Sequence, residues 1–98
     1  MQSKVNENEV FERKKEVSWR AVDGEGVVLD LTTGAYYSIN LVGLEVWKRC
    51  DGKHPFRKII TDISKEYKRD IKKVSLDVQK FIAQLGRQNL LVPSTKKR

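Results

Sequence analysis

From residue 16, apolar and polar side chains alternate along the chain, which is typical of a strand with one buried face. The apolar positions of this alternation are Val17, Trp19 and Ala21. Two glycines within residues 23–26 then indicate a turn, because glycine accepts the positive φ angles of tight turns. The pattern therefore predicts a strand over residues 16–21 that opens a hairpin.

Two further strands are predicted over residues 27–31 and 35–39, separated by a turn at residues 32–34. The first is rich in β-branched and other apolar residues and has Val27, Leu29 and Leu31 on one face. The second has Ala35, Tyr37 and Ile39 on one face and Tyr36 and Ser38 on the other. Three strands joined by short turns predict an antiparallel meander.

From Asn40 the apolar positions follow the period of helices. A first helix is predicted between an Asn40 cap and Cys50, and a second has Pro55 in its first turn. Ser75 is expected to cap a third helix that ends within residues 86–89. Residues 90–93 then either cover the core or add one strand. The predicted fold class is α+β, a three-stranded antiparallel sheet followed by three helices, which is the order of a winged helix-turn-helix domain.

Length and composition fit one small domain, with 98 residues of which 39% are hydrophobic. Residues 1–15 have few apolar side chains and are expected to form a flexible N-terminal arm. Residues 16–93 form the predicted domain, and residues 94–98 a basic disordered tail. No stretch approaches the roughly 18 consecutive apolar residues of a membrane span, and the charged first residues do not suit a signal peptide. We therefore expect a cytoplasmic location and no membrane partner.

The formal net charge of +7 is concentrated in residues 53–73, which carry a net charge of +5. Such a field attracts anionic partners, and both nucleic acid and an acidic peptide are candidates. A DNA-reading third helix needs basic and amide side chains on its exposed face. This helix offers only Gln79, Lys80, Gln84, Arg87 and Gln88, and Asp77 would face phosphate. DNA binding by a winged helix therefore remains the alternative function, and nucleic acid is the less expected partner.

Catalytic chemistry has little support in the sequence. Cys50 and His54 are four residues apart, but Asp51, Gly52 and Pro55 interrupt the helix that would align them. One cysteine and one histidine cannot supply the usual four zinc ligands. We therefore expect no enzymatic activity, no metal and no cofactor.

The strand over residues 35–39 is a candidate binding element. If it lies at the edge of the sheet, its unpaired N–H and C=O groups form a template for another strand. An extended peptide could pair there, the N-terminal arm or the exit segment could cover the edge, or two copies could pair as a homodimer. The residue pattern alone leaves these alternatives open.

Several motifs, in their order and spacing, resemble the PqqD-like family, whose members are also called RiPP precursor peptide recognition elements. The motifs are Val28–Leu31, Gly34–Asn40, Val46-Trp47, Asp51-Gly52 and then Val78, Phe81-Ile82 and Leu85. The most specific part is Tyr37-Ser38-Ile39-Asn40, followed at helical spacing by Trp47 and then by Asp51-Gly52. The resemblance covers residues 17–93, which is nearly all of the predicted domain.

This resemblance implies a winged helix-turn-helix fold that binds a peptide and neither binds DNA nor catalyses a reaction. In the family, the leader of a ribosomally made precursor peptide adds as an antiparallel strand to the third strand, and its apolar side chains enter a groove against the third helix. The peptide is then presented to a modifying enzyme, often a radical S-adenosylmethionine protein, or to a leader peptidase. The chain would thus be an adaptor with a peptide and an enzyme as partners.

Carried onto this chain, the resemblance assigns the peptide ladder to the backbone of Ala35, Tyr36, Tyr37, Ser38 and Ile39. The groove against the third helix would have Val78, Phe81, Ile82 and Leu85 at its base and Lys80, Gln84, Arg87 and Gln88 at its rim. Lys72 and Lys73, together with Lys80, would steer an acidic leader toward the groove.

Overall fold

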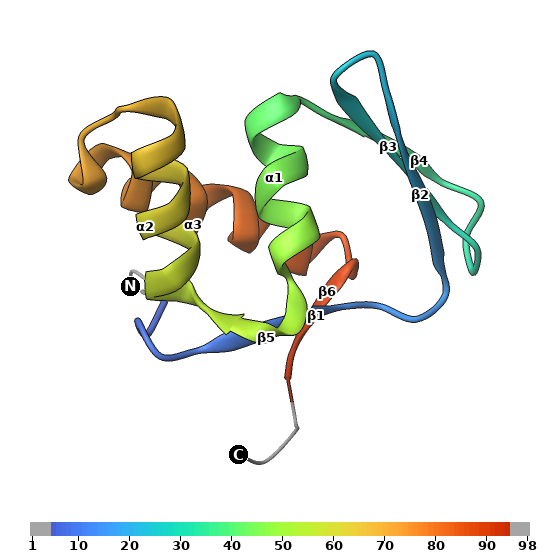
Figure 1. The fold of residues 1–98 in the computed structure, drawn as a ribbon. Helices are drawn as coiled ribbons and strands as arrows, with labels where there is room; N and C mark the ends of the chain where they lie inside the picture. Colours follow the sequence, from blue (N-terminus) through green and yellow to red (C-terminus); the bar gives the residue numbers. More distant parts are fainter. Residues whose placement is uncertain (1–4, 95–98) are drawn as a thin grey trace.

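The computed structural model describes residues 5–94, which form three helices and two three-stranded antiparallel sheets (Figure 1). The elements are β1 (Val10–Arg13), β2 (Val17–Val22), β3 (Glu25–Asp30), β4 (Tyr36–Ile39), α1 (Leu41–Arg49), β5 (Asp51–Pro55), α2 (Phe56–Tyr67), α3 (Ile71–Arg87) and β6 (Leu91–Pro93). The strand orders are β2-β3-β4 and β5-β1-β6. The α+β class is confirmed, with a second sheet that the sequence did not predict.

The sheet β2-β3-β4 is the predicted meander. Asp23 and Gly24 close its first hairpin with φ angles of 50° and 80°, the two positive values of a type I′ turn. β3 then pairs with β4 in an antiparallel register that runs from Gly26 opposite Ile39 to Leu29 opposite Tyr36. In this sheet β4 is an edge strand.

The face of β3 that packs on the core is not the one with most apolar side chains. Val28 is fully buried and Asp30 is 2% exposed, whereas Leu31, just past the end of the strand, is 60% exposed. Both faces of residues 27–31 carry apolar side chains, so alternation could not tell them apart. Val27, Leu29 and Leu31 share a face, as predicted, but it is the face turned away from the core.

The second sheet corrects the expectation for the N-terminal arm. Val10–Arg13 form β1, the central strand between β5 and β6, and Phe11 is buried. The backbone of β1 bonds to strands much later in the chain, so the local composition of residues 1–15 carries no sign of the strand. Both alternatives for residues 90–93 hold, because Leu91–Pro93 form the added strand β6 and Leu90 and Leu91 are buried in the core. Residues 1–4 of the predicted arm and 95–98 of the predicted tail lie outside the described residues.

Two of the three helices begin within one residue of the predicted start. The Asn40 side chain caps α1 by accepting a 2.8 Å hydrogen bond from the Gly43 N–H, and α2 follows Pro55 directly. The predicted Ser75 cap of α3 is wrong, because Asp70 caps this helix and α3 begins at Ile71. Asp is as good a cap as Ser, and the buried Val74 extends the apolar face of α3 toward its start.

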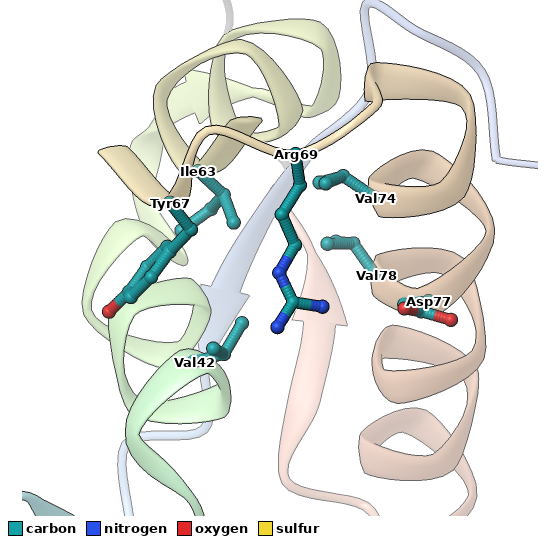
Figure 2. Close-up of a pocket in the computed structure, with 7 residues that line it drawn as sticks. All are labelled: Val42, Ile63, Tyr67, Arg69, Val74, Asp77 and Val78. Atoms are coloured by element: carbon teal, nitrogen blue, oxygen red, sulfur yellow. The ribbon is translucent and has the colours of Figure 1, made fainter. Parts of the chain in front are cut away.

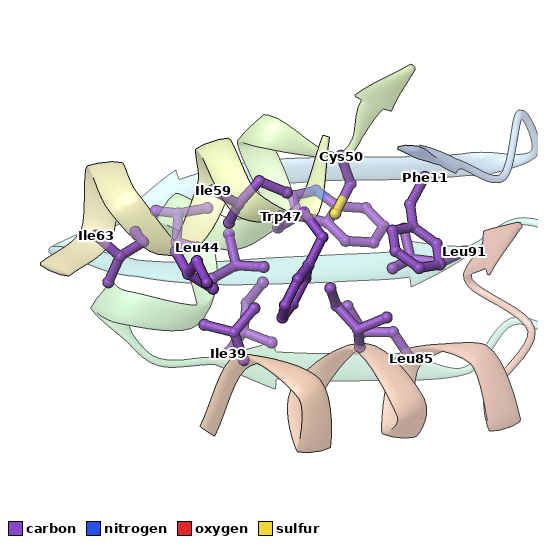
Figure 3. Packing of buried hydrophobic residues seen from close by; sticks show 14 of the residues in the cluster. Phe11, Ile39, Leu44, Trp47, Cys50, Ile59, Ile63, Leu85 and Leu91 are labelled. Atoms are coloured by element: carbon purple, nitrogen blue, oxygen red, sulfur yellow. The ribbon is translucent and has the colours of Figure 1, made fainter. Parts of the chain in front are cut away.

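Trp47 lies at the centre of the core, among residues from both sheets and all three helices (Figure 3). The ring of Trp19, on β2, meets it edge-on at a centroid distance of 6.4 Å. The Arg13 guanidinium lies 5.4 Å from the Trp19 ring centre and donates to the carbonyl oxygens of Trp47 and Lys48 at the end of α1. These contacts fix β1 and the sheet β2-β3-β4 to the same helix.

Within residues 5–94, none of the helices combines the length and the apolar character that crossing a membrane requires.

Candidate functional site

The outer edge of β4 presents backbone groups that no described strand pairs. The Asp30 N–H donates a 2.9 Å hydrogen bond to the Ala35 carbonyl oxygen, so the backbone of Ala35 faces β3. In an antiparallel pair this orientation alternates along the strand. Tyr37 and Ile39 therefore also face β3, and the N–H and C=O groups of Tyr36 and Ser38 face outward.

Neither the N-terminal segment nor the exit segment covers this edge within the described residues. β1, from the N-terminal segment, lies between β5 and β6 in the other sheet. β6, from the exit segment, pairs with β1 in the register Phe11 opposite Pro93. For the described part of the chain, two of the alternatives that the sequence left open are thereby removed, and the edge is left for another strand.

The position of β4 is set from its two ends. Before the strand, the buried Asp30 carboxylate accepts a 2.9 Å hydrogen bond from the Thr32 N–H and lies 3.3 Å from Lys14 Nζ. The Thr32 N–H and the Lys14 ammonium hold the pKa of Asp30 below its usual value. At the other end, Ile39 packs over Gly26 so closely that a β carbon there would lie 2.7 Å from Ile39 Cγ1.

The predicted base of the helix groove is mostly core. Val78, Ile82 and Leu85 are each less than 5% exposed, whereas Phe81 is half-buried. The Phe81 ring lies over Gly43 at the start of α1, where a β carbon would be 3.0 Å from Phe81 Cζ. Phe81 thus marks the flank of α3 that faces the start of α1, just after the chain leaves β4.

Of the predicted rim residues on α3, Gln84 lies closest to this flank. A helix turns about 100° per residue, so Gln84 lies near Phe81, Lys80 lies a quarter turn away, and Arg87 lies about a third of a turn away. Gln88 follows the helix as its C-terminal cap. Of the two predicted steering lysines, Lys73 lies about a quarter turn from Phe81, and Lys72 lies on the opposite flank.

A small apolar cleft continues the site beyond the end of β4 (Figure 2). It lies between α1, α2 and α3 and is lined by Val42, Ile63, Tyr67, Arg69, Val74, Asp77 and Val78. Figure 2 shows the Arg69 side chain extending across the cleft between the valines of α3 and the α1–α2 side. Within residues 5–94 no carboxylate forms an ion pair with Arg69. The cleft therefore offers an apolar pocket with a free cation at its mouth.

Sequence reasoning missed Val42, Tyr67, Arg69 and Val74 as parts of one site. Tyr67 and Val74 belong to apolar helix faces, which the pattern explains as core. Arg69 lies in the turn after α2, where Lys68 adopts the left-handed conformation with φ 51°. No periodicity indicates where the side chain of a turn residue points, so only the packing of the helices brings Arg69 to the cleft.

Cys50 and His54 do not form a nucleophile and base. Cys50 is fully buried, and this burial raises the pKa of its thiol to about 12, so the thiol stays protonated at neutral pH. His54 Nδ1 lies 3.0 Å from Asp51 Oδ1 on β5. Among residues 5–94, no group of three or more His, Cys, Asp or Glu side chains is placed to hold a metal ion.

Comparison with known proteins places this geometry in context. The family model described as Coenzyme PQQ synthesis protein D (PqqD) matches residues 25–91. No curated protein matches the chain. A structure of TbiB1 in complex with the TbiA(beta) leader peptide is 25% identical, with a TM-score of 0.75 over 89% of this chain and 99% of that chain. Lasso peptide synthetase B1 complexed with the leader peptide is similar in fold, at 20% identity and a TM-score of 0.76, over 85% of this chain and 98% of that chain.

Proposed function

This chain belongs to the PqqD family, and we propose on that basis that it is an adaptor that binds the leader segment of a ribosomally made precursor peptide. The observation that carries the proposal is the open edge of β4, where Tyr36 and Ser38 present unpaired backbone groups. An extended leader adds there as a fourth strand and pairs through the backbone. The similar structure of TbiB1 in complex with a leader peptide supports this role.

In this proposal the leader runs antiparallel to β4. Its earlier residues then lie beyond Ile39, over the start of α1, where Val42 forms one wall of the cleft. An apolar leader side chain enters the cleft between Val42, Val74 and Val78. A carboxylate beside it pairs with Arg69, which has no acidic partner among residues 5–94. The cleft gives sequence preference to a backbone ladder that by itself accepts most residues.

Positive charge around the cleft speeds the encounter with an acidic leader. Arg69 and Lys73 lie nearest the site, and Lys80 lies further around α3. Lys72 acts at most through the long-range field, because it lies on the far flank of the helix. Asp77 is the acidic residue that lines the cleft, and its negative charge repels a second carboxylate there.

The adaptor itself catalyses no reaction in this proposal. It works in the cytoplasm, where it delivers the bound leader to a modifying enzyme, either a radical S-adenosylmethionine protein or a leader peptidase. The homodimer foreseen from the sequence would use the same β4 edge, so peptide binding and edge-to-edge dimerisation exclude each other.

A titration tests the function directly. A fluorescein-labelled leader peptide, taken from the precursor encoded beside this chain, is titrated with the protein and followed by fluorescence anisotropy. We expect saturable binding with a micromolar or lower dissociation constant. No saturation at such concentrations, together with salt-sensitive binding of a labelled DNA duplex, would instead support the winged-helix DNA-binding alternative.

A further inference from the structure

The sheet β2-β3-β4 has an apolar face that nothing in the described chain covers. We call this the outer face. Its apolar side chains are Val22, Val27, Leu29, Leu31 and Tyr36, and the strand register places Glu16, Ser18, Arg20, Glu25 and Ser38 among them. Tyr36 is 71% exposed, Leu31 60% and Val22 43%. In Figure 1 this sheet stands at the right of the molecule, and all three helices lie to its left.

Strand register gathers these side chains into one patch. Leu29 lies directly opposite Tyr36 across β3 and β4, and Val27 lies opposite Arg20 on β2. Leu31 follows two residues after Leu29 on the same side, where its N–H still bonds to the Glu16 carbonyl oxygen of the neighbouring chain segment. Residues directly opposite on one face of a sheet are in side-chain contact.

This face does not contribute to the core. The inner face of the same sheet packs on α1 through Val28 and Trp19. Contiguous exposed apolar side chains disfavour solubility and typically mark a surface that contacts another molecule. An apolar run with both faces hydrophobic, as in residues 27–31, is the pattern of a strand that is covered on both sides.

We propose that the outer face docks the enzyme that acts on the bound leader, an inference that rests on the proposed function. The outer face is continuous with the proposed peptide site, because Tyr36 belongs both to the outer face and to the open edge of β4. A leader strand paired at that edge turns every second side chain onto the same face. The docked enzyme therefore contacts the adaptor and its peptide together, and prefers the loaded adaptor to the free one.

The residues of the outer face indicate what kind of partner surface would bind to it. Its centre is apolar, and Arg20 is the cation opposite Val27. Within residues 5–94, no carboxylate forms an ion pair with Arg20. Glu16 and Glu25 lie on the same face, opposite Leu31 and Val22 at its two ends. The matching surface is therefore apolar at its centre, with a carboxylate placed to meet Arg20 and no carboxylate against the two ends.

The test compares two leucines that are almost equally exposed. Leu31 on the outer face is 60% exposed and Leu76 on α3 is 59% exposed, so Leu31→Lys and Leu76→Lys change charge and surface equally. The probe is the purified modifying enzyme encoded with the precursor, immobilised and exposed to the full chain with and without its leader peptide. Biolayer interferometry measures enzyme binding, and anisotropy measures peptide binding. Sedimentation velocity gives the oligomeric state.

We expect Leu31→Lys to weaken enzyme binding at least tenfold, with the peptide dissociation constant unchanged within about twofold, while Leu76→Lys changes neither. Equal enzyme binding by the wild type and Leu31→Lys overturns the inference, as does an equal loss in Leu76→Lys. A dimer that Leu31→Lys converts to a monomer without loss of enzyme binding assigns the face to a second copy and also overturns it. Failure of peptide binding in the wild type would instead refute the proposed function.

Discussion

The carbonyl oxygen of Ala35 accepts a 2.9 Å hydrogen bond from the backbone N–H of Asp30. This bond shows which residues of β4 turn their backbone groups toward β3 and which turn them outward, because the two orientations alternate along a strand. It leaves the N–H groups of Tyr36 and Ser38 as the donors that β4 offers to a new strand. Of the five residues predicted for the peptide ladder, Tyr36 and Ser38 are therefore the two with outward-facing backbone groups.

Ser38→Pro tests whether the outward-facing N–H of Ser38 pairs with the leader. Proline removes an outward-facing N–H and places a ring where the leader backbone would lie, while an edge strand tolerates proline at such a position. We expect leader affinity to fall at least tenfold, which is about 1.4 kcal/mol. The measurement is fluorescence anisotropy, with circular dichroism to follow the fold.

Ala21→Pro is the matched control at the opposite edge of the same sheet. The Leu31 N–H donates to the Glu16 carbonyl oxygen, so alternation turns Ala21 outward on β2. We expect this variant to bind the leader as the wild type does. Equal affinity of Ser38→Pro and Ala21→Pro would show that the leader does not pair with β4.

Arg69→Glu tests the cleft. The reversed charge would repel a leader carboxylate at the mouth of the cleft, so we expect the affinity for an acidic leader to fall about tenfold. Lys65→Glu changes the net charge equally but lies on the exposed surface of α2. The long-range field is the same in both variants, so their difference in dissociation constant isolates the local contact. Identical losses would mean that Arg69 acts only through the general field.

Gly26→Ala tests the contact that positions the end of β4. The new methyl group would lie 2.7 Å from Ile39 Cγ1 and 2.9 Å from Leu44 Cδ1. Overpacking of this kind costs about 1–3 kcal/mol of unfolding free energy, measurable by urea unfolding. Gly86→Ala is the control, because its methyl group meets nothing within 4 Å and helix propensity favours alanine by up to about 1 kcal/mol. A stable Gly26→Ala protein would show that Ile39 is free to move.

Asp30 gives the stability a defined pH dependence. Its pKa in the folded chain lies below the usual 3.8, chiefly through the hydrogen bond from the Thr32 N–H and also through Lys14. A carboxyl group with a lowered pKa stabilises the fold fully above its unfolded pKa and loses this effect as the pH falls through the folded value. The midpoint of thermal unfolding of Asp30→Asn should therefore lie below that of the wild type at neutral pH. The two midpoints should converge as the pH falls from neutral through the folded pKa of Asp30. A constant difference over this range would exclude the ionised carboxylate as the cause.

Local sequence patterns predicted much of the secondary structure of this protein. The meander over residues 16–39, the Asn40 cap and the α2 face all follow from the spacing of apolar residues and from turn and cap chemistry. Residues 25–91 also fall within the family that the motifs suggested. The start of α3 was missed by five residues, because Asp70 and Ser75 are comparable caps.

The sequence by itself determined which residues form β4 and which of its side chains share a face, because periodicity is local. The tertiary structure alone decided that β4 is an edge, that β1 fills the centre of a second sheet, and that Arg69 reaches the cleft beside Val42. These outcomes depend on backbone pairing and helix packing between segments far apart in the chain. The face of β3 that meets the core was decided in the same way, since Val28 and Leu29 are equally apolar and only the docking of α1 distinguishes them.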